Sequence, residues 1–319
     1  MRAEIHVPIS PTAGFFMRVQ MLAASLRRFG GALADSPVIV TVSRDCEPYD
    51  LAAALPWSER LGVSWRWMAA DDFERHGIYG TALMRFTYDF QAPFVVMLDA
   101  DTLVTGPLDD LLELEEAEAF GGVIADVSPM YFKTPFADGV GRGGQMFWLD
   151  LYELAGLPAP ASTYEHLAWG LIDTDPERRF CPAYFNLGML AAPAAIARRI
   201  GDVVLADMAR VDQYLDTNFK CQLAVALSLV RTQTPALPLA AQWNFPNNQD
   251  IADRNPEDAA DVRILHYRKR EEVGRDTELT SLDGIDGLLR RRGLLPVNTL
   301  LQERIAAVRA DLEPVLADA

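Results

Sequence analysis

Two aspartates one residue apart, Asp99 and Asp101, directly follow the apolar run 94–98. Carboxylates at the carboxyl end of a buried strand lie where open α/β sheets bind their ligands. Two such side chains suit a hard divalent cation, which prefers oxygen ligands. The spacing alone is weak evidence, because Asp173 and Asp175 repeat it. The position after a strand favours a metal site, and the alternative of a turn cap beside a solvated carboxylate stays open.

A histidine ends another short apolar run late in the chain, at His266. An imidazole at a strand end can add a nitrogen ligand to two aspartates. The residues after it include Arg268, Lys269 and Arg270, which are suited to phosphate oxygens. A lone histidine is often structural and a basic triplet is often a solvated turn. In a chain of net charge −16 such a triplet is less expected.

Alternating strand and helix patterns surround these residues and predict an α/β fold with a parallel sheet covered on both faces. We expect strands at 4–9, 37–42, 63–68, 94–98, 121–126, 185–192 and 262–267. We expect helices at 14–28, 81–90, 107–112, 194–212 and 217–230, and a last helix that opens with a capping box at Thr299–Gln302 and ends near Leu312. Gly, Pro and aromatic residues predict an irregular or mobile loop at 128–147.

Composition excludes several classes of protein. Lys and Arg total 29 against 45 Asp and Glu, which argues against nucleic acid and against electrostatic attachment to anionic lipid. A phosphate-bearing ligand needs only a local site and stays possible. The 3 cysteines lie far apart, so a disulfide framework or a sulfur-rich zinc site is not expected. We see no secretory signal, no transmembrane segment and no internal repeat, and expect a cytoplasmic protein.

The order of three motifs resembles that of the GT-A glycosyltransferases. Leu-Asp99-Ala-Asp101 comes first, Tyr-Phe-Asn186-Leu-Gly188 follows, and a late strand ends in His266. The chain looks most similar to family 8, the glycogenin-like and lipooligosaccharide galactosyltransferase group. The resemblance implies a GT-A type, Rossmann-like, mainly parallel sheet flanked by helices. Its catalytic domain would span 1–270, with a nucleotide-binding half at 1–101, an acceptor-side half at 102–270 and a C-terminal helical extension at 271–319.

The resemblance also implies roles for individual residues. Asp99, Asp101 and His266 would hold Mn²⁺ or Mg²⁺ on the diphosphate of a UDP-sugar. The implied donor-binding set is Pro8, Ser10, Arg85, Asp99, Ala100, Asp101, Asn186, Gly188, His266 and Lys269, and the implied catalytic pair is Asp126 and Gln222. Simpler interpretations are that Arg85 forms a surface ion pair, Asp126 caps a turn and Gln222 is an exposed helix residue.

The sequence departs from the family pattern at several positions. Relatives usually offer an aspartate at the end of the first strand, whereas this chain has Pro8 to Thr12. The Lys-Pro-Trp that follows the late histidine in relatives is missing, and Lys269 is our candidate for its phosphate contact. Cys221 replaces an aspartate expected before Gln222. These departures leave the donor base and sugar open.

The resemblance implies transfer of a sugar with retention of configuration. We expect the acceptor to approach from 128–145 and 162–180, where four aromatic residues suit sugar stacking: Tyr131, Trp148, Tyr164 and Trp169. One alternative is a nucleotidyltransferase, although 8–16 lacks the Gly-rich basic loop expected there. The other is a non-catalytic sugar-nucleotide-binding protein on the same fold. The acceptor, whether saccharide, lipid or protein, and the oligomeric state stay open.

Overall fold

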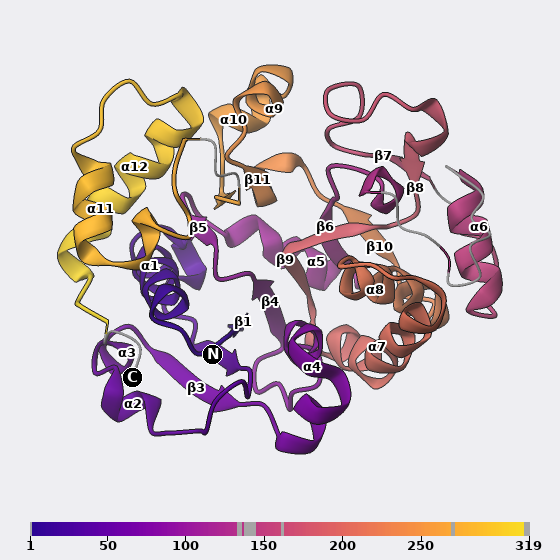
Figure 1. The fold of residues 1–319 in the computed structure, drawn as a ribbon, viewed down its shortest axis with the longest axis horizontal. Coiled ribbons are helices and arrows are strands. Elements are labelled where there is room, and N and C mark those ends of the chain that lie inside the picture. Colours follow the sequence, from indigo (N-terminus) through magenta and orange to yellow (C-terminus); the bar gives the residue numbers. More distant parts are fainter. Residues whose placement is uncertain (1, 133–135, 137–144, 161–162, 269–271, 316–319) are drawn as a thin grey trace.

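A seven-stranded sheet runs through the centre of the molecule (Figure 1). The computed structural model describes residues 2–132, 136, 145–160, 163–268 and 272–315. The strand order is β10-β6-β9-β4-β1-β2-β3. Neighbouring strands are parallel, except that β9 runs antiparallel to both β4 and β6. The predicted α/β class with a mainly parallel sheet is therefore confirmed. The bounds are β1 Ala3–Ile9, β2 Val38–Val42, β3 Val63–Trp67, β4 Phe94–Leu98, β6 Phe120–Ile124, β9 Phe185–Pro193 and β10 Ala236–Pro238.

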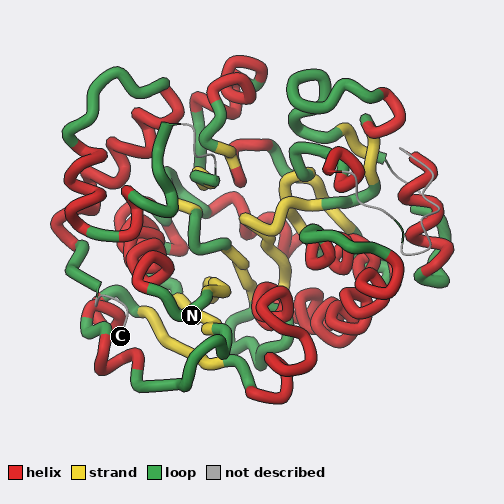
Figure 2. The backbone as a smooth tube through the Cα atoms, in the orientation of Figure 1, coloured by secondary structure: helices red, strands yellow, loops and turns green. Residues whose placement is uncertain are grey.

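Helices cover both faces of this sheet (Figure 2). The described helices are α1 Ala13–Phe29, α2 Leu51–Ala54, α3 Trp57–Arg60, α4 Ala70–Met84, α5 Glu113–Glu116, α6 Gln145–Leu154, α7 Ala194–Tyr214, α8 Lys220–Arg231, α9 Gln249–Arg254, α10 Pro256–Ala260, α11 Leu282–Leu289 and α12 Pro296–Val308. The central strand β4 is buried along its whole length, and its alternate side chains enter two separate cores. Val96 and Leu98 join the core that contains α1, whereas Val95 and Met97 join the core that contains α7 and α8. Burial on both faces explains why this strand reads as a continuous apolar run.

A second sheet brings distant parts of the chain together. It has three strands in the order β11-β12-β5, with bounds β11 Phe245–Pro246, β12 Ile264–His266 and β5 Thr102–Val104. Strand β12 pairs antiparallel with β5, in a register that places His266 opposite Thr102. The late histidine therefore lies beside the segment that links β4 to β5. A third, two-stranded sheet pairs β7 Tyr164–Glu165 with β8 Phe180–Cys181.

The helix predicted over 81–90 is wrong beyond Met84, where α4 ends. Gly77 interrupts α4 with a φ of 59°. After the helix, Phe86, Tyr88 and Phe90 are buried while the residues between them are exposed. This alternation has the period of an extended chain, so tertiary burial, rather than a helical face, explains the apolar pattern.

Other predicted bounds also shift. The capping box at 299–302 is wrong, because α12 already begins at Pro296 after the N-cap Leu295, and the Thr299 hydroxyl donates to the Leu294 carbonyl. A 3-10 turn at Asp109–Leu112 leads into α5 where one short helix was expected. Most of the segment 128–147 lies outside the described residues; its described ends are a 3-10 turn at Pro129–Phe132 and the start of α6.

The C-terminal segment packs into the core that also contains β1 and α1. Leu279, Ile285, Leu301 and Ile305 are fully buried there, in the core that also contains α1. Figure 1 shows α11 and α12 next to α1. Within the described ranges, we found no helix whose length and apolar character would carry it across a bilayer.

Candidate active site

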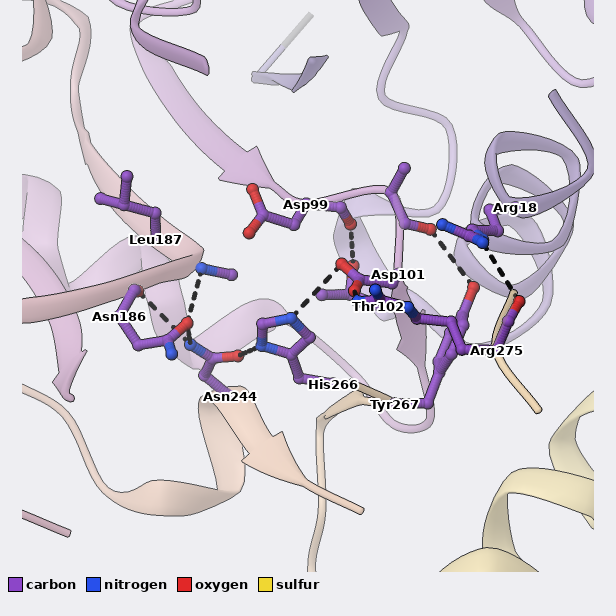
Figure 3. A network of polar contacts seen from close by, with 12 residues as sticks. Arg18, Asp99, Asp101, Thr102, Asn186, Leu187, Asn244, His266, Tyr267 and Arg275 are labelled. Carbon is purple, nitrogen blue, oxygen red and sulfur yellow. Dashed lines mark hydrogen bonds and ion pairs between the residues drawn. The ribbon is translucent and has the colours of Figure 1, made fainter. Parts of the chain in front are cut away.

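Asp99, Asp101 and His266 meet at the edge of the central sheet (Figure 3). Asp99 directly follows β4, Asp101 directly precedes β5, and His266 ends β12. One ligand atom from each of the three lies within 4.8 Å of the other two. Asp101 Oδ1 and His266 Nε2 are 3.3 Å apart. The strand pairing therefore assembles the three side chains that the sequence nominated.

A chain of hydrogen bonds fixes the tautomer of His266 (Figure 3). The Gly188 amide, which can only donate, bonds Asn186 Oδ1 at 2.9 Å. Asn244 Nδ2 donates to the same oxygen at 3.1 Å, which leaves Asn244 Oδ1 facing His266 Nδ1 at 3.0 Å. Nδ1 must therefore carry a proton, and in the neutral ring Nε2 presents its lone pair toward Asp101. The Nε2 lone pair and the Asp101 carboxylate repel each other unless a proton or a metal ion lies between them.

Gly188 allows the ring to occupy this position. A Cβ at residue 188 would lie 2.3 Å from His266 Nδ1 and 2.7 Å from Asn244 Oδ1. The Gly188 carbonyl also accepts from the Asp99 amide at 3.0 Å, which ties β9 to the start of the aspartate segment. The sequence predicted that Asn186 and Gly188 contact the donor. The structure places Gly188 against the imidazole and links Asn186 to it through Asn244, and Asn186 also lines a cavity described below.

Each of the two aspartates pairs with an arginine. Arg85 is fully buried behind Asp99, donates to its Oδ1 at 3.2 Å and donates to the Leu187 carbonyl at 3.1 Å. Arg85 is therefore not a surface residue, and it is not among the residues that line the two cavities described below. Its contact with Asp99 fixes the position of that carboxylate. Arg275 donates to Asp101 Oδ2 at 2.5 Å. Sequence reasoning missed Arg275, because it lies in an irregular segment with no pattern.

These charges set the protonation of the site. Burial favours neutral Asp101, but His266 and Arg275 outweigh burial and hold the pKa of this carboxyl well below its usual range. At Asp99 burial outweighs Arg85 and raises the pKa. Burial lowers the pKa of His266, but the Asp101 carboxylate outweighs it and raises the pKa overall. Two carboxylates and an imidazole whose lone pair is oriented by Asn244 fit a divalent ion such as Mn²⁺ or Mg²⁺.

A cavity of about 340 Å³ opens beside Asp99 and Asp101. The predicted donor-binding residues Pro8, Ser10 and Ala100 line it. Its remaining lining residues are Ile9, Phe15, Arg18, Ile78, Thr81, Ala82 and Arg275. We call this space the first cavity. The altered end of β1 is therefore part of the same wall as the two aspartates.

A second cavity, of about 300 Å³, contains the two predicted catalytic residues. Asp126 lies two residues beyond β6, is 8% exposed and forms an ion pair with Arg268. Gln222 accepts from the Tyr184 hydroxyl at 3.0 Å, and its Nε2 donates to the Phe185 carbonyl at 3.4 Å. Gln222 is therefore held inside a cavity instead of being an exposed helix residue. The lining residues are Ala125, Asp126, Val127, Tyr131, Phe132, Ile172, Tyr184, Asn186, Phe219, Gln222 and Arg268.

The predicted acceptor-side aromatics are only partly at this cavity. Tyr131 lines it, whereas Trp148 is 4% exposed and packs in the core. Tyr164 and Trp169 are not among its lining residues. Phe132 and Phe219, whose ring centroids are 5.2 Å apart, line the cavity instead, and no spacing in the sequence indicated them. The predicted phosphate contact, Lys269, lies outside the described residues.

Comparisons with known proteins identify a family and a fold for this chain. The model of the Rhodobacterales glycosyltransferase domain family matches residues 15–230, and no curated protein matches the chain. The fold is similar to galactosyltransferase LgtC in complex with donor and acceptor sugar analogs, at 16% identity and a TM-score of 0.54, over 98% of this chain and 97% of that one. A structure of an active-site mutant of LgtC gives 16% identity and a TM-score of 0.52, covering 95% of each chain.

The bifunctional glycosyltransferase WbbM matches at 15% identity and a TM-score of 0.47, and this chain spans only 46% of its length while 84% of this chain is covered. The family model covers more than half of the chain and includes β4, the two aspartates and β9. The chain therefore belongs to the Rhodobacterales glycosyltransferase domain family and is a glycosyltransferase of the GT-A fold.

Proposed function

We propose that this protein transfers a sugar from a nucleoside diphosphate sugar, with a UDP-sugar as the first choice, to a hydroxyl acceptor, with a divalent ion held by Asp99, Asp101 and His266. The observation that carries the proposal is the convergence of these three side chains, of which Asp99 and Asp101 line the first cavity and His266 directs Nε2 at Asp101. When bound, such an ion would act as a Lewis acid and neutralise the charge that develops on the diphosphate leaving group.

The residues of the chain divide the remaining work between two cavities. In our proposal the nucleotide occupies the first cavity, beside Pro8, Ser10 and Ala100. The sugar and the acceptor hydroxyl occupy the second cavity, where Asp126 and Gln222 are held by partners. Preorganised groups of this kind stabilise charge without reorganising during the reaction.

Asn186 links the second cavity to the candidate metal site. It lines the second cavity and bonds Asn244, which in turn orients His266.

Retention of anomeric configuration is part of the proposal and rests on the likeness to family 8. The family assignment favours sugar transfer over the nucleotidyltransferase and the non-catalytic binding protein.

The test is release of the free nucleoside diphosphate from UDP-, GDP-, ADP- and TDP-sugars, with and without Mn²⁺. We expect slow, Mn²⁺-dependent hydrolysis of one donor by the wild type and its loss in Asp101→Ala. Asp283→Ala, which removes an exposed carboxylate in the first turn of α11, is the matched control and should behave like the wild type. Failure of every donor and every nucleoside diphosphate to bind in calorimetry, with or without metal, would refute the proposal.

A further inference from the structure

Arg275 contacts an atom that the proposed metal site also requires. Its guanidinium donates to Asp101 Oδ2 at 2.5 Å, while Asp101 Oδ1 faces His266 Nε2 (Figure 3). Arg275 also lines the first cavity and keeps 20% of its side chain exposed. A cation of the protein and a metal ion would therefore compete for the same carboxylate.

The backbone of this segment is anchored independently of that contact. Arg18, on α1, donates to the Arg275 carbonyl at 3.1 Å and to Asp276 Oδ1 at 2.7 Å. The Arg18 side chain is 7% exposed, and its Nε is buried with no hydrogen-bond partner within the described structure. Since Arg18 fixes the main chain at residue 275, the Arg275 guanidinium can change partners while its backbone stays in place.

The charges of the first cavity indicate which second partner fits. Its charged lining groups are two carboxylates, Asp99 and Asp101, and two guanidiniums, Arg18 and Arg275. A diphosphate that approached the carboxylates alone would be repelled. A guanidinium matches the spacing of phosphate oxygens and can donate two hydrogen bonds to them at once.

We propose that Arg275 exchanges partners: it pairs with Asp101 when no donor is bound, and donates to the diphosphate oxygens when nucleotide and metal bind together. Arg275 then makes the metal site weak until the diphosphate arrives, and supplies the phosphate contact that the sequence assigned to Lys269. The inference rests on the proposed function, since it specifies how the same donor site binds its ligand.

The test uses two separate probes, Mn²⁺ alone and UDP in the presence of Mg²⁺, on the 319-residue chain. Arg275→Gln should bind Mn²⁺ alone about five-fold more tightly, because a competing partly buried ion pair is lost. The same variant should bind UDP at least about ten-fold more weakly, because a charge-assisted contact to phosphate is lost. Its affinity for UMP should fall less. Electron paramagnetic resonance of free Mn²⁺ and titration calorimetry measure the two affinities.

Two further variants separate this exchange from a structural role. Arg275→Lys keeps the charge and should fall between the wild type and Arg275→Gln for both probes. Arg309→Gln removes an arginine that pairs with Asp286 at 2.6 Å on α11, away from the cavity, and should change neither affinity. The opposite signs expected for Mn²⁺ and UDP cannot arise from partial unfolding, which weakens both.

The outcomes separate the exchange from the proposed function. If Arg275→Gln leaves both the Mn²⁺ and the UDP affinity unchanged, or weakens both, the exchange is overturned and Arg275 has only a structural role. If the wild type binds none of the four donors and none of UDP, GDP, ADP and TDP, the proposed function fails. Tighter Mn²⁺ binding by Arg275→Gln in that case would still support the competition for Asp101, and unchanged Mn²⁺ binding would refute it.

Discussion

The contact between Gly188 and His266 allows a sharp test of the candidate metal site. In Gly188→Ala the new Cβ would lie 2.3 Å from Nδ1 and 2.5 Å from Cε1 of the imidazole. Atoms this close must separate, so the ring has to leave the position in which it contacts Asn244 and Asp101. Because Gly188 is buried in β9, overpacking should cost about 1–3 kcal/mol of unfolding free energy.

The larger effect should be on metal binding. The substitution displaces a candidate ligand and breaks the hydrogen bond that fixes its tautomer, and loss of such an outer partner typically costs about 10–100-fold in metal affinity. We expect a loss of this size for Mn²⁺, measured by electron paramagnetic resonance under conditions where urea denaturation shows the variant to be folded. Donor hydrolysis should fall in parallel.

Two glycine variants serve as controls. In Gly122→Ala the Cβ would meet Phe185 Cγ at 2.8 Å in the core, so stability should fall without a change in Mn²⁺ affinity. In Gly287→Ala nothing lies within 4 Å of the new Cβ, so the unfolding free energy should rise by about 0.5–1 kcal/mol or stay unchanged. Mn²⁺ binding by Gly188→Ala at the wild-type affinity would show that the contact with His266 is irrelevant to the metal.

Three further predictions concern buried groups. Arg85→Gln should lower the unfolding free energy by about 3 kcal/mol in urea, because it removes a buried cation from Asp99 and leaves the Leu187 carbonyl without its donor; an unchanged midpoint would contradict this. Asp126→Asn should keep UDP binding but lose about 100-fold or more in turnover, and normal turnover would remove Asp126 from the mechanism. Burial lowers the pKa of His166 from 6.5 to about 4, so the unfolded chain binds more protons between these values and stability falls as pH drops through them, by about 2 kcal/mol at pH 5. His166→Asn, which can keep the 2.9 Å contact to the Ala125 carbonyl, should remove that acid sensitivity, and an unaltered pH slope would refute the assignment.

The sequence was most informative where burial is two-sided. Strands β4 and β9 read as long apolar runs because both of their faces are covered, and their ends then point to Asp99, Asp101 and Asn186. His266 could be nominated because it ends a similar run on β12. These residues are adjacent to strong local signals, so one-dimensional patterns suffice to find them.

The residues that the sequence missed act through contacts between distant segments. Asn244 lies on the 3-10 turn Ala241–Asn244, where no periodicity marks it, yet it orients His266. Arg18 reads as an ordinary helix residue, and only packing brings it to Arg275. The same reason explains the wrong helix at 81–90, since tertiary burial of Phe86 and Tyr88 imitated a local pattern.

The pairing of β5 with β12 has a consequence for how such chains can diverge. The register that sets His266 opposite Thr102 keeps the imidazole near Asp101 whatever the length of the loops between these strands. Under the proposed function, insertions and deletions around the second cavity would alter which acceptor is accepted while the donor chemistry stays constant. The loss of one residue inside β12 would instead turn His266 to the opposite face of the strand. The fold thus separates a part of the chain that tolerates changes in length from a part that does not.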